Sequence, residues 1–215
     1  MITEFSKSNT VLNTFLRELR DVTIQGDSMR FRRNLERIGE IIAYEISKTL
    51  NYETVKITTP MAKTKSSIPV EEPVIATILR AGLPLHNGVL NYFDKAQNTF
   101  ISAYRKHGDQ NDFEVEIEYL ASPNIDGKTL ILCDPMLATG SSMVLAYKAI
   151  LEKGTPKKVH IVSVVASKSG MNFCIKNLPK EIDYWIGEID ETLDTKSYIV
   201  PGLGDAGDLA YGTKE

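Results

Sequence analysis

A nine-residue loop carries the residue types that suit a phosphorylated sugar. It reads Asp134-Pro-Met-Leu-Ala-Thr-Gly-Ser-Ser142 and lies between an apolar run and a segment of helical spacing. The residues from Thr139 to Ser142 therefore begin a helix, where unpaired backbone N–H groups and the helix dipole attract anions. Gly140 lets the backbone approach such an anion, and Asp134 can accept hydrogen bonds from sugar hydroxyls. The alternative is an ordinary strand-to-helix turn with capping serines, so the loop alone names no ligand.

The strands that would carry this loop are predicted from apolar runs of strand length. These runs cover residues 74–79, 99–104, 129–133, 158–166 and 184–189. Residues 113–119 instead alternate apolar side chains with glutamates, which predicts a half-exposed antiparallel strand that could form a flap.

Helical spacing separates the predicted strands. It covers residues 9–50 in two apolar stripes, then residues 83–93 and 143–153, with Gly154 as a stop signal. Residues 61–72 have no clear period and are interpreted as a connecting loop or a short hairpin. The alternation of strands and helices predicts an α/β fold with an open, mainly parallel sheet flanked by helices on both faces.

Ligands in such sheets bind beyond the carboxyl ends of the strands. Arg80 and Arg105 each follow a predicted strand, as do residues 134–142 and 167–170. We therefore expect two arginines and the anion-binding loop to face the same crevice.

Composition narrows the class of protein. The chain has 215 residues, enough for a single domain over residues 1–215, and a formal net charge of −3, which argues against general nucleic-acid binding. Two cysteines, Cys133 and Cys174, fit neither a disulfide framework nor a metal pattern and are predicted to be buried thiols. No apolar signal or membrane-length stretch is present, which favours the cytoplasm and no membrane partner.

Four motifs together resemble the uracil phosphoribosyltransferase family. They are Ile78-Leu-Arg-Ala-Gly82, Tyr104-Arg105, Asp134-Pro-Met-Leu-Ala-Thr-Gly140 and Tyr198-Ile-Val-Pro-Gly-Leu-Gly-Asp-Ala-Gly-Asp208. The resemblance implies a type I phosphoribosyltransferase fold with a β flap or hood, residues 1–50 as packing helices, a flap at 105–120 and a base-binding loop at 196–211. It also implies a pyrimidine-salvage reaction, uracil plus 5-phosphoribosyl 1-pyrophosphate (PRPP) to UMP plus pyrophosphate, with Mg²⁺ carried by PRPP.

The resemblance further implies which residues bind PRPP. Arg80, Arg105 and Asp205 are expected to contact it together with the loop residues Asp134, Pro135, Met136, Leu137, Ala138, Thr139, Gly140, Ser141 and Ser142. Guanidinium groups suit the pyrophosphate because they stay charged and bind phosphate oxygens in pairs. Asp134, Asp205 and Arg105 are the expected catalytic residues. No residue is expected to bind the metal directly, although Asp205 can reach Mg²⁺ through water.

The glycine-rich tail is expected to choose the base. Gly202-Leu-Gly204-Asp-Ala-Gly207 matches the dinucleotide fingerprint, but the chain ends too soon for the acidic residue that the fingerprint requires about 20 positions later. The resemblance instead implies that Ile199, Gly204, Asp205 and Ala206 contact uracil, whose alternating donors and acceptors suit exposed backbone groups. Discrimination against cytosine follows from polar groups that would be left unpaired.

Several questions stay open at this level. His86, His107 and His160 are scattered and fit packing or loop positions better than that of a general base. The first 70 residues match the family poorly, Ser141 stands where a second glycine is usual, residues 165–170 replace a more usual Ala-Pro-Glu-Gly ending, and Leu209 replaces a common basic residue. The alternatives are an RNA-binding pyrimidine-operon regulator on the same fold and a phosphoribosyltransferase for another base. Exposed apolar segments favour a homodimer or higher homo-oligomer, and a GTP effector is left open.

Overall fold

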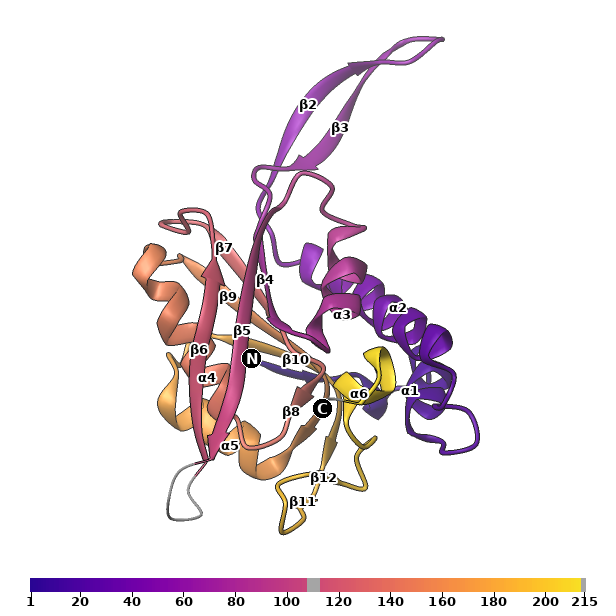
Figure 1. Ribbon diagram of the computed structural model, residues 1–215. Coiled ribbons are helices and arrows are strands. Elements are labelled where there is room, and N and C mark those ends of the chain that lie inside the picture. Colours follow the sequence, from indigo (N-terminus) through magenta and orange to yellow (C-terminus); the bar gives the residue numbers. More distant parts are fainter. Residues whose placement is uncertain (108–112, 214–215) are drawn as a thin grey trace.

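An eight-stranded sheet forms the centre of the molecule, in the order β1-β10-β9-β7-β4-β5-β6 with β8 beside β9 (Figure 1). The computed structural model describes the backbone of residues 1–107 and 113–213 and the side chains of residues 1–102 and 117–213. The strands of this sheet are β1 (Ile2–Glu4), β4 (Val74–Leu79), β5 (Gln97–His107), β6 (Phe113–Ala121), β7 (Thr129–Cys133), β8 (Met136–Leu137), β9 (Lys158–Ser167) and β10 (Asp183–Asp190). All neighbours pair in parallel except β5 and β6.

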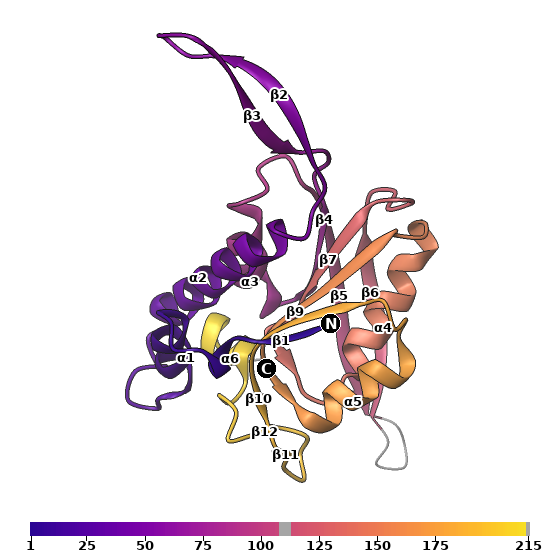
Figure 2. The same cartoon turned by 180° about the vertical axis from the view of Figure 1, so that it is seen from behind.

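Helices cover both faces of this sheet (Figures 1 and 2). One face carries α1 (Leu12–Arg20), α2 (Ser28–Ser47), α3 (Gly82–Leu90) and α6 (Ala206–Tyr211). The other carries α4 (Ser141–Ile150) and α5 (Lys168–Asn177). Single turns of 3-10 helix, η1 (Phe5–Lys7) and η2 (Leu151–Lys153), follow β1 and α4. The predicted α/β architecture is confirmed.

The central strands are mainly apolar because both of their faces are buried. In β7, Leu130 and Leu132 pack into the core on the α4 side, whereas Ile131 and Cys133 pack into the core on the α2 side. Successive side chains of a strand point to opposite faces, so burial on both sides requires a continuous apolar run. This is why β4, β7, β9 and β10 fall within one residue of their predicted bounds.

Strands with little buried surface were harder to predict. The segment predicted as a loop or short hairpin is the second strand of a hairpin, β2 (Tyr52–Thr58) with β3 (Lys63–Pro69), which projects from the body of the molecule (Figure 1). Most of its side chains are exposed, so neither strand shows an apolar period. The two-residue strands β11 (Thr192–Leu193) and β12 (Ile199–Val200) and the edge strand β1 were not predicted, for the same reason.

The β5–β6 pair includes the segment predicted as a flap. The two strands pair antiparallel from Phe100 opposite Ala121 to His107 opposite Phe113, which confirms the antiparallel strand. β5 is longer than predicted, and Arg105 lies within it rather than after its end. Residues 108–112 of the predicted flap lie outside the described residues. No helix in the part of the chain that the structure describes is long and apolar enough to cross a membrane.

Candidate active site

A pocket of about 700 Å³ opens at the carboxyl ends of β4 and β7. Its walls come from the segment after β4, the loop after β7 and the glycine-rich tail. The described residues that line it are Ile78, Leu79, Arg80, Ala81, Ser102, Asp134, Met136, Ala138, Ser142, Lys196, Ser197, Tyr198, Asp205, Ala206 and Gly207. The fold therefore brings predicted site residues into one pocket, among them Arg80, Asp134, Ser142, Asp205 and Ala206.

The 134–142 loop is held along the sheet before it turns. The Asp134 backbone N–H donates to the Val162 carbonyl at 3.0 Å, and the Pro135 carbonyl accepts from the N–H groups of Val164 and Val165. Met136 and Leu137 then pair with β9 as the short strand β8. The first half of the loop is thus fixed to β9 through its backbone, and the turn at Thr139 to Ser142 follows it.

The start of α5 supports this turn from behind. Ser167 caps α5 by accepting from the Gly170 N–H, and its hydroxyl donates to the Ala138 carbonyl at 2.6 Å. Gly170 lies so close to the loop that a Cβ there would be 2.2 Å from the Ala138 oxygen. Residues 167–170 thus act as the support of the loop, a role that their position after β9 did not reveal.

The turn itself encloses a second, small cavity. This cavity of about 40 Å³ is lined by Asp134, Met136, Leu137, Ala138, Thr139, Gly140, Ser142 and Met143. At roughly 10–15 Å³ for each water, it has room for about three waters or one small anion. Gly140 caps α4 with a φ of +80°, and the Ser141 N–H and hydroxyl bond with the Thr139 hydroxyl. The loop thus ends in a cup at a helix N-terminus, as predicted.

Asp134 connects the cup to the large pocket because it lines both. Burial raises the pKa of its carboxyl to about 7, and a backbone N–H bond from Met136 at 3.3 Å opposes this rise. A carboxylate held in this way lacks partners for its charge. It is therefore suited to accept hydrogen bonds from a ligand.

Of the two predicted arginines, the structure describes the side chain of Arg80 and the backbone of Arg105. The Arg80 side chain crosses to the tail, where it pairs with Asp208 at 3.1 Å and donates to the Gly212 carbonyl. Arg105 lies three residues beyond Ser102, which pairs with the last residue of β4, so its backbone is beyond the carboxyl end of that strand. The Arg105 side chain lies outside the described residues.

The tail residues divide between the pocket wall and the interior. Asp205 caps α6 by accepting from the Asp208 N–H at 3.0 Å and lines the pocket with Ala206. Ile199 is buried and Gly204 has a φ of +89°. In the described part of the chain, four of the predicted site residues line neither cavity: Pro135, Ser141, Ile199 and Gly204.

Three further lining residues belong to the predicted 196–211 loop, although no individual role was predicted for them. Lys196, Ser197 and Tyr198 form the turn between β11 and β12, and the Asp194 carboxylate organises this turn by accepting from the N–H groups of Lys196 and Tyr198, both at 2.8 Å. Ser197 has a φ of +64°. Tyr198 opens the tail motif, whereas the signal for Lys196 and Ser197 was their position directly before it.

The histidines and cysteines occupy interior positions. His86 and His160 are buried and line neither cavity, and the His160 Nδ1 accepts from the Trp185 indole N–H at 3.1 Å. Burial lowers the pKa of His160 to about 4, so it stays neutral at pH 7. Cys133 and Cys174 are free and buried, as predicted. His107 lies outside the described side chains.

Several known proteins are similar to this chain in sequence and in fold. The family model described as uracil phosphoribosyltransferase matches residues 6–213. The uracil phosphoribosyltransferase of Porphyromonas gingivalis is 56% identical over 206 residues, covering 96% of this chain and 95% of that protein. The match thus includes the first 70 residues, which the motifs alone had left out.

Solved structures agree with the family match. The AQ2163 protein from Aquifex aeolicus is 31% identical with a TM-score of 0.85, covering 99% of this chain and 98% of that one. A hypoxanthine phosphoribosyltransferase from Staphylococcus aureus, 14% identical with a TM-score of 0.50 over 91% of this chain and 92% of that one, shares the fold alone. Since the family model and the similar sequences span almost the whole chain, the chain belongs to the uracil phosphoribosyltransferase family.

Proposed function

We propose that this chain transfers the phosphoribosyl group of PRPP to uracil, releasing pyrophosphate and forming UMP. The proposal rests on one observation: the 134–142 loop and the glycine-rich tail line the same pocket. One wall offers an anion cup and a carboxylate for a phosphorylated sugar. Another wall offers the backbone of the glycine-rich tail, whose motif resembles that of the family.

The 5′-phosphate of PRPP is assigned to the small cup formed by Thr139 to Ser142. The N-terminus of α4 supplies backbone N–H groups and a favourable dipole there, and the hydroxyls add donors. Asp134, at the lip of the cup, would accept from the ribose hydroxyls. Arg80 and Arg105 would bind the pyrophosphate, because guanidinium groups match pairs of phosphate oxygens.

The residues present fit a Mg²⁺ ion that arrives with PRPP. Mg²⁺ keeps several waters and is usually bound through one or two carboxylates plus substrate phosphates. Asp134 and Asp205 line the pocket, whereas no three His, Cys, Asp or Glu side chains in the described part of the chain could hold a metal on their own. When bound, the ion would neutralise charge on the pyrophosphate. Asp205 would reach it through water.

The base is assigned to the tail loop, residues 196–211. Gly204, Asp205 and Ala206 would present backbone N–H and C=O groups to the edge of uracil, with Ile199 beside them. Asp205 and Ala206 line the same pocket as Asp134, so the base and the sugar would meet within it. Backbone groups of fixed direction favour the hydrogen-bond pattern of uracil over that of cytosine.

Chemistry at the anomeric carbon would then rest on positioning and charge. The bond from that carbon to the pyrophosphate oxygen breaks, a bond to the uracil nitrogen forms, the proton of that nitrogen passes to water or to the departing pyrophosphate, and positive charge builds on the ribose in the transition state. Asp134 lies on the side where a negative charge stabilises such a centre, while the arginines stabilise the departing anion. Neither buried histidine lines the pocket, so orientation of the two substrates would be the main source of rate.

A pyrophosphate-release assay with competing bases tests the proposed function. Uracil, cytosine, hypoxanthine and adenine would be supplied with PRPP and Mg²⁺, and nucleotide products would be separated by chromatography. We expect UMP to dominate by a factor on the order of 10⁴ over CMP, because the wrong base leaves buried polar groups unpaired. A different preferred base, or no pyrophosphate release, would refute the assignment.

Replacing Asp205 by asparagine should lower turnover by about 10- to 100-fold, the range for loss of an outer-shell partner of a metal. Asparagine is as good an N-cap as aspartate, so α6 should keep its cap and the protein its melting temperature. Asp27→Asn is the matched control because Asp27 caps α2, accepting from Met29 and Arg30, and does not line the pocket. Equal kcat values in the two variants would remove Asp205 from the site.

The wider context of the enzyme is also proposed. We infer that residues 1–215 act as one catalytic domain, with residues 1–50 as packing helices, 105–120 as a flap and 196–211 as the base-binding loop. We also infer a homodimer or higher homo-oligomer acting in the cytoplasm, which light scattering and cell fractionation would test. Adding GTP to the pyrophosphate assay tests whether it is an effector.

A further inference from the structure

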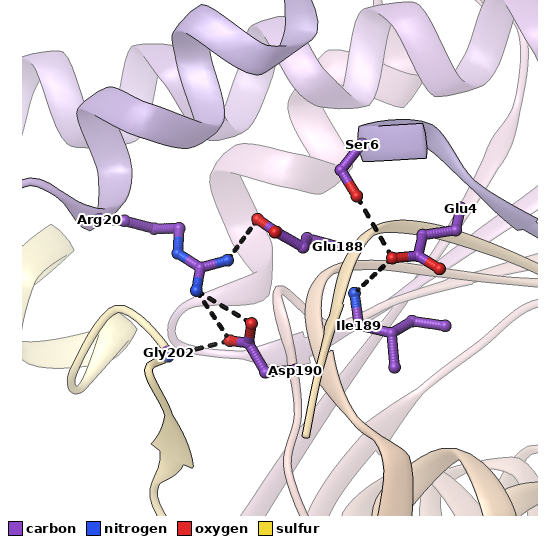
Figure 3. Close-up of polar contacts among 7 residues, drawn as sticks. All are labelled: Glu4, Ser6, Arg20, Glu188, Ile189, Asp190 and Gly202. Carbon is purple, nitrogen blue, oxygen red and sulfur yellow. Dashed lines mark hydrogen bonds and ion pairs between the residues drawn. The ribbon is translucent and has the colours of Figure 1, made fainter. Parts of the chain in front are cut away.

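A buried carboxylate connects the N-terminal helices to the start of the glycine-rich turn (Figure 3). Asp190, at the end of β10, is 6% exposed. Its carboxylate accepts two bonds from the Arg20 guanidinium, at 2.9 and 3.1 Å, and one from the Gly202 N–H at 2.9 Å. The acid therefore joins residues from opposite ends of the chain.

Arg20 ends α1 and contacts two acids of β10. Glu188 and Asp190 are two residues apart, so their side chains lie on the same face of the strand, and Arg20 pairs with both (Figure 3). The Arg20 side chain is only 16% exposed. These three charged side chains stabilise one another. Removal of the Arg20 guanidinium would leave the buried charge of Asp190 without its ionic partner.

Gly202 is the point at which this cluster acts on the tail. It has a φ of +56°, and a Cβ there would be 2.0 Å from the Ile199 carbonyl oxygen. The turn is therefore tight, and the bond to Asp190 fixes the direction of its N–H. Because Ile199 and Gly204 to Ala206 flank this turn, its shape sets where their backbone groups point.

The segment after α1 holds the tail at a second point. The Gln25 side-chain amide donates to the Leu203 carbonyl at 3.1 Å and to the Leu19 carbonyl at 2.7 Å. Further along, the Arg32 guanidinium donates to the Ala210 carbonyl of α6 at 2.6 Å. The tail is thus tied to the N-terminal helices at Gly202, Leu203 and Ala210.

We propose that Arg20, acting through Asp190, is a positioning residue that holds the tail loop in the shape that accepts the base. This inference rests on the proposed function, since it concerns the loop assigned to uracil. Arg20 lines neither cavity and would touch neither substrate. Its loss should therefore affect uracil and leave the PRPP cup, which is built on β7, β9 and α5, as it is.

Arg20→Met tests the proposal, with Arg30→Met as the control. Arg30 also ties the N-terminal helices together, by a 3.2 Å pair with Glu18, and no hydrogen bond or ion pair joins it to the described residues of the tail. We expect Arg20→Met to raise the KM for uracil by about 10- to 100-fold, the scale of a small misplacement of a bound group, and the KM for PRPP by a clearly smaller factor, because the tail also carries Asp205. Arg30→Met should keep both constants.

Amide hydrogen exchange supplies a readout that needs no turnover. Peptides covering residues 199–207 should exchange faster in Arg20→Met than in Arg30→Met. Arg20→Lys, which keeps the charge but cannot make the paired bonds, should give an intermediate KM for uracil. If Arg20→Met does not fold, Gln25→Ala removes the second tie without leaving a buried charge and should raise the KM for uracil severalfold.

The outcomes separate the two claims. Wild-type protein that releases no pyrophosphate with uracil would refute the proposed function. Active wild-type protein, together with an Arg20→Met variant that has an unchanged KM for uracil and unchanged exchange at 199–207, would refute the positioning role alone. Equal rises in both Michaelis constants, or a fall in kcat with constant KM values, would also refute it, because they indicate a general structural role.

Discussion

Replacing Gly140 by alanine should abolish use of PRPP, with kcat/KM for PRPP falling by about 100-fold or more. Gly140 has a φ of +80°, which costs an L-residue about 1–2 kcal/mol. Its Cβ would also be 2.7 Å from the Gly170 carbonyl oxygen and 2.9 Å from the Cys174 sulfur. The turn must therefore move, and the cup of about 40 Å³ that it encloses would change shape. Steady-state kinetics and calorimetry on one preparation give both effects.

Gly127→Ala separates backbone strain from steric contact. Gly127 has a φ of +66°, but no atom lies within 4 Å of its Cβ position, and it is remote from both cavities. This control should lose about 1 kcal/mol of stability and keep its kinetics. If Gly140→Ala behaved like Gly127→Ala, the cup would not be the phosphate site.

Replacing Asp134 by asparagine should lower kcat/KM for PRPP by about 10²- to 10³-fold, because a preorganised charge next to the reacting ribose is lost. The dependence of kcat/KM on pH should also differ between wild type and the variant. Burial raises the pKa of Asp134 to about 7, so wild-type kcat/KM should fall as the pH drops below about 7. The asparagine variant should lack this acid limb. An acid limb unchanged in the variant would assign it to another group.

The same substitution should stabilise the ligand-free protein, by an amount that grows as the pH rises. Since burial raises the pKa of Asp134 in the folded state above its ordinary value of 3.8, the folded state binds more protons than the unfolded state between about pH 4 and pH 7. Stability from this group is present below about pH 4 and is lost as the pH rises through 7. The free energy of unfolding of Asp134→Asn should therefore exceed that of wild type by on the order of 1–2 kcal/mol at pH 8, after discounting for the partial exposure of the side chain. At pH 5 the difference should be much smaller.

Asp183→Asn provides a control of opposite sign. Burial alone would raise the pKa of Asp183, but the hydrogen bond from Lys158 and its charge outweigh this, and the net pKa is lowered. Its ionised form stabilises the fold, so Asp183→Asn should be less stable than wild type at pH 8. Thermal unfolding of the three proteins at pH 5 and pH 8 checks both signs.

The parts of the fold that could be predicted are those encoded by neighbouring residues. The apolar runs of β4, β7 and β9 and the helical stripes of α1 and α2 depend on periods that are visible within about ten residues. The 134–142 loop could be placed for the same reason, because a strand, a turn glycine and a helix start follow one another directly. The exposed hairpin β2–β3 lacks an apolar face and left no comparable pattern.

The sequence by itself determined the sheet, the anion cup and the family motifs, since each depends on short segments. The tertiary structure decided what supports them. Ser167 holds the Ala138 carbonyl from 29 residues away, and Arg20 reaches Asp190 across 170 residues. The raised pKa of Asp134 likewise results from burial, which only the folded chain supplies. Such contacts depend on how the chain crosses the sheet, and no local period of side chains records that path.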